Sequence, residues 1–230
     1  MRLGLSIPLF NEAASVTEVV ASIHAVLHNA NIDATLVLVN NGSTDATGEH
    51  IDALRVPGEI EVVHLRENAG YGGGILSGLA HLERSGLPPV IGWCWGDGQV
   101  SATALPPLFA AIREGADLAK AHRTRRGDGL NRQFISGAYA ATMRMLGVGV
   151  SDINGCPKLM SRTAFEAIQP RSSDWFLDAE VVLKAERMGL NIASHPVEMR
   201  PRSAGKSKVG LRTIAEFLTN IARWRLNDEP

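Results

Sequence analysis

The stretch VLVNNGSTDAT, residues 37 to 47, decides the fold class of this chain. It runs from apolar residues into two asparagines, Asn40 and Asn41, and a glycine before a helical pattern begins. This succession is typical of a strand that is covered on both faces and ends in a tight polar turn. Buried strands that alternate with helices build α/β domains. The stretch therefore predicts a sheet with helices on both sides.

The same succession recurs along the first half of the chain. Apolar runs predict strands at Leu3 to Ile7, Thr35 to Val39, Ile60 to Leu65, Val90 to Trp95 and Ala116 to Ala121. Helical patterns follow from about Glu12, Thr44, Gly73 and Thr103. This βαβα order predicts a mostly parallel sheet with helices on both faces.

After residue 123 the rhythm changes to an α+β pattern. A basic loop precedes a helix near Arg132 to Leu146, a short strand around Lys158, a helix near Trp175 to Met188 and a strand at Asn191 to Val197. No linker or repeat separates the two parts. We therefore expect one domain over residues 1–230, with a first half at 1–122, a second half at 123–209 and a C-terminal amphipathic helix at 210–226.

The composition excludes several classes of protein. The chain is 45% hydrophobic and 20% charged, which suits a globular domain, and its net charge of −1 gives no reason to expect nucleic acid as a partner. Cys94 and Cys156 stand far apart without a CxxC pair, so neither a disulfide framework nor a zinc site is indicated. No apolar run approaches the length of a membrane span. We expect a cytoplasmic protein.

Polar groups follow the first four predicted strands. They read PLFNE (8–12), NNGSTD (40–45), ENAGYGGG (67–74) and GDGQ (96–99). The carboxyl ends of parallel strands share one edge of a sheet, and ligands of open α/β sheets bind outside that edge. Each group alone is accounted for as a turn, but turn chemistry does not require Glu12, Asn68 or Gln99. Together the four groups predict a ligand site.

Two familiar ligand motifs fail on spacing. A dinucleotide fingerprint that starts at Gly70 and Gly72 needs a small residue where Ile75 stands. His24 and His28 lie one helical turn apart, but the glutamate that a zinc protease carries after its first histidine is missing. The sequence therefore predicts neither an NAD site nor a catalytic zinc.

Seven motifs together resemble family-2 inverting glycosyltransferases. They are SIPLFNE (6–12), LVNNGSTDAT (38–47), ENAGYGGGILSGL (67–79), GDGQVS (96–101), DINGCPKLMSR (152–162), FLDAEVVLKAERMGL (176–190) and PRSAGKSKV (201–209). They occur in the family's order and cover essentially the whole chain. The resemblance is closest to the polyprenyl-phosphate (dolichyl-phosphate) mannosyl- or glucosyltransferase branch. It implies a GT-A fold, a nucleotide-sugar donor and a divalent cation, Mg²⁺ or Mn²⁺.

The resemblance also implies which residues bind the donor. These positions are Pro8, Glu12, Asn40, Asn41, Asn68 and Asp97. The family usually has two aspartates where Asn40 and Asn41 stand. A carboxamide offers both a hydrogen-bond donor and an acceptor, which match the edge of uracil or thymine. The change therefore favours a UDP- or dTDP-sugar over GDP-mannose.

A second departure from the family concerns the metal. The family's Asp-x-Asp aligns with Trp95, Gly96 and Asp97, so one of two carboxylates is missing. Mg²⁺ is often held by only one or two carboxylates together with phosphate oxygens and water. We expect Asp97 and Gln99 to hold the cation with the donor's pyrophosphate, and Asp97 to be essential for catalysis.

Basic residues indicate a phosphate acceptor. The resemblance places Arg123, Arg132, Arg202, Ser207 and Lys208 against the acceptor phosphate or the donor pyrophosphate. Arginine binds phosphate in bidentate fashion. A phosphate monoester is already an anion at neutral pH, so it needs no general base. We therefore expect transfer of the sugar to a lipid phosphate such as a polyprenyl phosphate.

Two alternatives stay open. A hydroxyl acceptor requires a carboxylate base, and Asp178 or Glu180 stands at the family position for it, although both acids are also accounted for at a helix N-terminus. A nucleotide-sugar binding protein without turnover is suggested by Asn40 and Trp95, which replace two family acids. The sugar, the nature of the acceptor and the oligomeric state are left open.

The last motif is followed by a segment with helical periodicity, VGLRTIAEFLTNIARWRL (209–226). Arg212, Arg223 and Arg225 flank its apolar stripe, and Trp224 is of the type that prefers a membrane interface. Packing against the sheet accounts for the period equally well. Because the segment directly follows the basic motif, we expect peripheral contact with anionic lipid at the inner face of the membrane.

Overall fold

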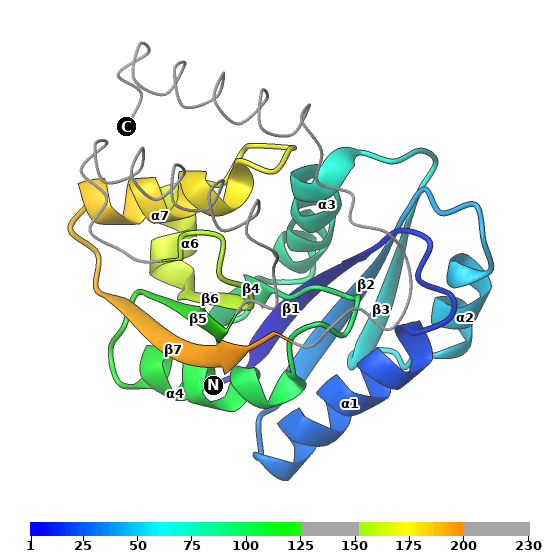
Figure 1. Ribbon diagram of the computed structural model, residues 1–230, viewed down its shortest axis with the longest axis horizontal. Coiled ribbons are helices and arrows are strands. Elements are labelled where there is room, and N and C mark those ends of the chain that lie inside the picture. The colour runs from blue at the N-terminus through cyan, green and yellow to red at the C-terminus, as the bar shows by residue number, and fades with distance from the viewer. Residues whose placement is uncertain (126–151, 200–230) are drawn as a thin grey trace.

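The computed structural model describes residues 1–125 and 152–199. Their strands form one sheet in the order β3-β2-β1-β4-β6-β5-β7 (Figure 1). The strands are β1 (Leu3–Leu9), β2 (Ala34–Asn41), β3 (Ile60–Leu65), β4 (Val90–Trp93), β5 (Leu118–Arg125), β6 (Lys158–Ser161) and β7 (Ile192–Glu198). The helices are α1 (Val16–Asn29), α2 (Thr47–Ala53), α3 (Gly70–Arg84), α4 (Leu105–Arg113), α6 (Arg162–Ile168) and α7 (Leu177–Arg187), with a short 3₁₀ turn, η1 (Ala102–Ala104), before α4.

The sheet is mostly parallel, as the sequence predicts. β1 pairs in parallel with β2 and β4, β2 with β3, and β5 with β7. β6 runs antiparallel between β4 and β5. The first four strands therefore present their carboxyl ends at one edge of the sheet, and the polar turns lie at that edge.

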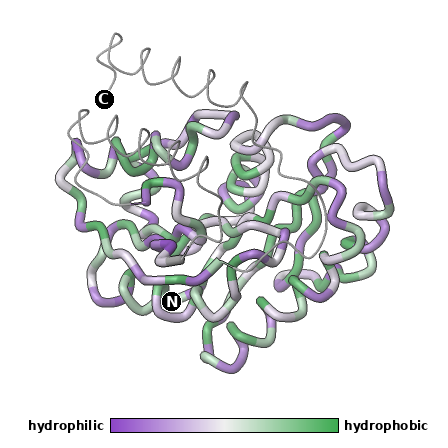
Figure 2. The backbone as a smooth tube through the Cα atoms, viewed as in Figure 1, coloured by the Kyte–Doolittle hydropathy of each residue, from purple (hydrophilic) through white to green (hydrophobic). Residues whose placement is uncertain are grey.

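Each face of the sheet has its own apolar core. On one face, Leu36 and Leu38 of β2 pack in a cluster with α1 and α4. On the other face, Val37 and Val39 pack in a cluster with α3, α6 and α7. Because successive residues of β2 are buried on opposite sides, the whole strand is apolar. Hydrophobic segments of the chain are coloured green in Figure 2.

Several strand bounds differ from the sequence prediction; β1 and β2 each extend two residues further, to Leu9 and Asn41. β4 ends at Trp93 instead of Trp95, and β5 continues beyond Ala121 to Arg125. The extension of β5 follows from its pairing with β7, which joins Arg123 to Val197. That partner is distant in the sequence, so the local apolar pattern does not reveal it. As a result Arg123 lies within a strand and not in the loop that was expected after it.

Helix α6 was not predicted. Ser161 is its N-cap, and the hydroxyl oxygen accepts a hydrogen bond from the Ala164 N–H at 3.1 Å. A serine before a short helical run is a recognisable start signal, and here it marks the helix. The helix expected near 132–146 and the one at 210–226 lie outside the described residues. Across residues 1–125 and 152–199, no helix is both long and apolar enough to cross a membrane.

Candidate active site

The turns after β1 and β2 are joined to each other by hydrogen bonds. Asn11 accepts from the backbone N–H of Thr44 at 2.9 Å, and the Glu12 N–H donates to Thr47 Oγ1 at 2.8 Å. Asp45 accepts from the N–H of Thr47 at 3.0 Å. Burial opposes ionisation of Asp45, but the hydrogen bonds from Thr47 prevail and lower the pKa of this carboxyl. The two predicted donor-binding turns therefore form one connected unit.

Asn41 ties β2 to the start of α3. Its side chain is almost fully buried. Its Oδ1 accepts from the Ala69 N–H at 2.9 Å, and its Nδ2 donates to the Gly70 carbonyl at 2.9 Å. Both ends of the amide are thus used within the protein. Asn41 would therefore support donor binding indirectly, by holding the residues at the start of α3 in place.

Asn40 is held in one orientation by two neighbours, Ser43 and His64. Its Oδ1 accepts from the Ser43 N–H at 3.0 Å. Its Nδ2 lies 3.2 Å from His64 Nδ1, and His64 Nε2 lies 2.9 Å from Asp52 Oδ1. Because Asp52 accepts the proton on Nε2, Nδ1 is the acceptor for the amide of Asn40. His64 and Asp52 were not identified from the sequence, since no motif links them to Asn40.

Pro8 lies near the end of β1, and Asn68 lies two residues before the start of α3. Asn68 Oδ1 accepts from the Gly70 N–H at 2.9 Å, at the entry to α3. Pro8 is half-buried in β1. A Cβ atom added to Gly74 of α3 would lie 3.0 Å from Pro8 Cβ and 2.9 Å from Asn41 Nδ2. The absence of a side chain at Gly74 therefore lets α3 lie directly against the ends of β1 and β2.

The glycine-rich start of α3 is covered by a loop of the second half. The Gly73 N–H donates to the Ser173 carbonyl at 2.8 Å. A Cβ atom on Gly72 would lie only 2.2 Å from the Ser172 carbonyl oxygen. These glycines therefore make room for protein backbone at this helix N-terminus.

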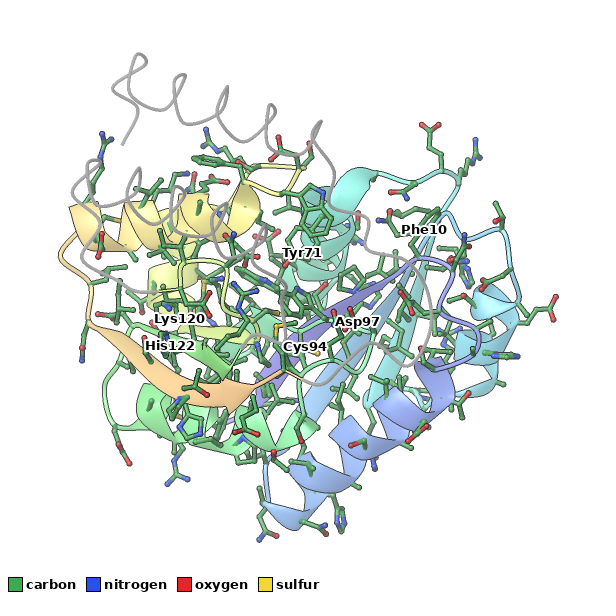
Figure 3. All side chains as sticks on the ribbon, viewed as in Figure 1. Phe10, Tyr71, Cys94, Asp97, Lys120 and His122 are labelled. Carbon is green, nitrogen blue, oxygen red and sulfur yellow. The ribbon has the colours of Figure 1, made fainter. Side chains whose placement is uncertain are left out.

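Asp97 and Gln99 lie in the turn that follows β4, where Figure 3 labels Asp97. Asp97 Oδ1 accepts from the Gln99 N–H at 3.1 Å, and Gly98 takes a φ of 68° that allows the tight turn. Within residues 1–125 and 152–199, no group of three or more His, Cys, Asp or Glu side chains could hold a metal. One carboxylate and one amide fit a Mg²⁺ or Mn²⁺ ion only if phosphate oxygens complete its shell.

A cavity of about 210 Å³ lies between α1 and the turn after β4. Its lining includes Ser15, the N-cap of α1, and Glu18 of that helix, together with Cys94, Trp95 and Gly98. Trp95 therefore contributes to the lining of an open space beside the turn that carries Asp97.

Arg123 is paired with Asp152. The backbone N–H of Arg123 donates to Asp152 Oδ2 at 2.7 Å, and its Nε donates to the same oxygen at 2.9 Å. Nη2 donates to the other carboxylate oxygen. Burial opposes the charge, but the bonds to Asp152 raise the pKa of Arg123. Asp152, to which the sequence assigned no role, thus orients the guanidinium that was predicted to bind phosphate.

Asp178 is buried in a polar network. The residue is only 3% exposed. Its Oδ1 accepts from Lys158 Nζ at 2.6 Å and from Trp93 Nε1 at 3.3 Å. Its Oδ2 accepts from Tyr71 Oη at 2.8 Å. A general base must lie within reach of the acceptor's proton. Both oxygens of Asp178 are already occupied by hydrogen bonds within the protein. This counts against the predicted role of Asp178 as a base.

Glu180 has a similar environment. It accepts from the backbone N–H groups of Arg171 and Ser172 at 3.0 and 2.7 Å, and from Lys184 Nζ at 2.8 Å. The residue is 3% exposed. Its carboxylate therefore holds the loop that covers the start of α3. This arrangement also counts against a role as base.

Trp95 and Tyr71 were not predicted as site residues. Trp95 Nε1 donates to Tyr71 Oη at 2.9 Å, and the Tyr71 ring stacks on Trp175 with centroids 4.5 Å apart. The Arg123 guanidinium carbon lies 5.9 Å from the centroid of the Trp95 ring. The four remaining residues predicted to bind phosphate, Arg132, Arg202, Ser207 and Lys208, lie outside the described residues.

Solved structures share this fold. Glucosyl-3-phosphoglycerate synthase from Mycobacterium tuberculosis, in complex with Mn²⁺, UDP and glucosyl-3-phosphoglycerate, matches with a TM-score of 0.70 and 20% identity over 98% of this chain and 79% of that chain. The same enzyme with Mn²⁺, UDP-glucose and phosphoglyceric acid matches with a TM-score of 0.71 and 21% identity over 96% and 80%. The fold is therefore of the GT-A glycosyltransferase type.

The chain belongs to glycosyl transferase family 2, whose pattern matches residues 5–169. The protein is thus a glycosyltransferase, and the resemblance drawn from its motifs is confirmed. It is 27% identical to polyprenol monophosphomannose synthase of Mycolicibacterium smegmatis over 95% of this chain and 84% of the relative. It is 25% identical to undecaprenyl-phosphate mannosyltransferase of Micrococcus luteus over 98% and 95%.

Proposed function

We propose that this enzyme transfers a sugar, with inversion, from a nucleotide-sugar to the phosphate of a polyprenyl lipid. One observation carries the choice of acceptor. The two carboxylates at the family's base position, Asp178 and Glu180, are each paired with a buried lysine. A hydroxyl acceptor would need such a base, whereas a phosphate is already ionised. The lipid phosphates in the names of both relatives support the same choice.

On the donor side, the joined turns after β1 and β2 would bind the nucleoside. Asn40 presents a fixed amide, because Ser43 and His64 each occupy one end of it. An amide oxygen has a second lone pair and its nitrogen a second hydrogen, which suit the paired acceptor and donor of uracil or thymine. A UDP- or dTDP-sugar is therefore favoured.

In the transfer step, an oxygen of the acceptor phosphate attacks the anomeric carbon of the donor. The bond from that carbon to the donor's phosphate oxygen breaks, and its electron pair leaves with the nucleoside diphosphate. Asp97 and Gln99 would hold a divalent cation, which when bound supplies positive charge to the leaving group. Arg123, oriented by Asp152, would hold phosphate oxygens. The lipid head group would be reached at the inner face of the membrane.

An acceptor pair of equal chain length tests this proposal. The purified chain is incubated with UDP-glucose, dTDP-glucose or GDP-mannose and Mn²⁺, and with either undecaprenyl phosphate or undecaprenol in detergent. We expect nucleoside diphosphate release and a glycosyl phospholipid, identified by mass, only with undecaprenyl phosphate. Transfer to undecaprenol, or to a sugar hydroxyl supplied as a third acceptor, that is lost in Asp178→Asn or Glu180→Gln would instead establish the hydroxyl-acceptor mechanism.

A second candidate is a nucleotide-sugar binding protein. Trp95 and Asn40 stand where the family has acids, which motivates it. Such a protein would bind a sugar nucleotide and release no nucleoside diphosphate with any acceptor in the same assay.

A further inference from the structure

A chain of hydrogen bonds runs from a buried ion pair to the turn that carries Asp97. Lys158 donates to Asp178 at 2.6 Å, Tyr71 donates to the other oxygen of Asp178 at 2.8 Å, and Trp95 donates to the Tyr71 oxygen at 2.9 Å. Trp95 stands two residues before Asp97. The chain therefore connects α7, β6 and α3 with the predicted metal turn.

The directions of these hydrogen bonds are fixed by chemistry. An indole N–H can only donate and an ionised carboxylate can only accept, so the Tyr71 hydroxyl must accept from Trp95 and donate to Asp178. Burial and the charge of Asp178 raise the pKa of Tyr71 well above its usual value, which keeps the hydroxyl protonated. A buried charge is retained only where its partners satisfy it. Lys158, fully buried, supplies that partner for Asp178.

Further contacts fix the two aromatic rings. The Tyr71 ring lies nearly parallel to Trp175, at an interplanar angle of 5°. The Trp95 ring faces the guanidinium of Arg123, whose position is set by Asp152. Trp95 is thus linked to both parts of the proposed site. Its backbone leads into the metal turn, and its ring faces Arg123, the arginine predicted to bind phosphate.

We propose that Asp178 and Tyr71 are positioning residues that act through Trp95 to orient the turn of Asp97 and Gln99. This inference rests on the proposed function, and it gives Trp95 a role in place of the family's acid. Trp95 anchors the metal turn to a rigid network, where an acid would ligate the ion. Because a one-carboxylate site depends on phosphate oxygens, a displaced turn weakens the binding of cation and nucleotide together.

A double-mutant cycle tests the proposal. Tyr71→Phe removes only the hydroxyl and keeps the ring on Trp175, whereas Trp95→Phe removes the indole N–H and keeps an aromatic wall. The Kd of whichever of UDP, dTDP or GDP binds the wild type is measured with Mn²⁺ by calorimetry, well below the melting temperature. Each single variant should bind the nucleotide roughly tenfold or more weakly, as for other lost supports of a metal site. The double variant should be no weaker than either single variant, because one chain is broken.

Lost stability needs its own control. Phe165→Leu on α6 loosens the same apolar core, since Phe165 is buried there, without touching the hydrogen-bond chain. This variant should melt at a lower temperature and keep the wild-type Kd. Additive effects of the two substitutions, or a wild-type Kd in both single variants, would overturn the positioning role while leaving the proposed transfer intact. A wild-type protein that binds none of the three nucleotides would overturn the proposed function, and this inference with it.

Discussion

Asp97 is the residue on which the proposed chemistry depends most directly. Asp97→Ala removes the carboxylate of the predicted metal site, so we expect transfer to fall at least about a hundredfold, corresponding to roughly 3 kcal/mol of lost transition-state stabilisation. Steady-state assays with saturating Mn²⁺ measure the change. Asp33→Ala, which removes an exposed acid that is distant from Asp97 in the sequence, serves as the control. An Asp97→Ala enzyme with wild-type turnover would remove the metal assignment.

Asn40 offers a test of nucleotide preference. In Asn40→Asp, one carboxylate oxygen still accepts from the Ser43 N–H, and the other replaces the amide nitrogen beside His64 Nδ1. Guanine presents two adjacent donors, which a carboxylate accepts better than an amide does. We expect the ratio of GDP to UDP affinity to rise in this variant. Competition calorimetry with both nucleotides decides, and an unchanged ratio would contradict base recognition by Asn40.

Lys120 leads to a prediction about pH. Burial, and then the charge of Lys158, lower the pKa of Lys120 from 10.5 to about 8. Between pH 8 and 10.5 the unfolded chain holds this proton and the folded chain releases it, so the contribution of Lys120 to stability rises with pH by at most about 1.4 kcal/mol per unit. Below pH 8 the contribution is constant.

Urea unfolding of the wild type and Lys120→Met at pH 7 to 10 measures this effect. Above pH 8, the free energy of unfolding of the wild type minus that of the variant should increase with pH. Buried thiols act in the opposite direction, because burial raises the pKa of Cys94 to about 12, but they are present in both proteins and cancel. A difference that is independent of pH would mean that Lys120 keeps its proton in the folded state.

At the scale of elements, α3 and the loop before α7 are joined through glycines. A Cβ atom at Gly72 would lie 2.2 Å from the Ser172 carbonyl oxygen and 2.8 Å from the Asp174 carbonyl oxygen. Alanine favours a helix more than glycine does, so Gly72→Ala would stabilise an isolated α3. In the folded protein the added methyl group must displace the loop.

We therefore expect Gly72→Ala to lower the melting temperature despite its helix propensity. Glu83→Ala, at an exposed position near the end of the same helix, should change it little. Thermal unfolding followed by circular dichroism compares them. A Gly72→Ala protein that melts at or above the wild-type temperature would show that the loop contact contributes nothing to stability.

For the whole molecule, the two parts of the chain are joined in one sheet. β6 and β5 follow β4 in the strand order, and β7 pairs with β5 at the edge. A ligand that binds only the folded state raises the melting temperature of such a cooperative unit. We expect UDP and dTDP to raise it more than GDP does, and Mn²⁺ to increase the shift. Equal shifts with and without Mn²⁺ would indicate that the cation takes no part in binding.

Much of the fold was predictable from local patterns. β1 to β4 and the helices after them follow from apolar runs and polar turns, because a strand buried on two faces needs apolar residues throughout. The extension of β5 and helix α6 were missed. The first depends on pairing with β7, and the second was too short for periodicity, although Ser161 signalled its start.

The sequence by itself determined the family, and it predicted the carboxyl edge as the ligand site and Asp97 as the metal residue, because these rest on residue types that follow strands in a fixed order. Only the tertiary structure decided what surrounds each charge. It joined Asp178 to Lys158, Glu180 to Lys184 and Arg123 to Asp152. An acid acts as a base only where its oxygens are accessible, and burial and partners come from elements far apart in the chain.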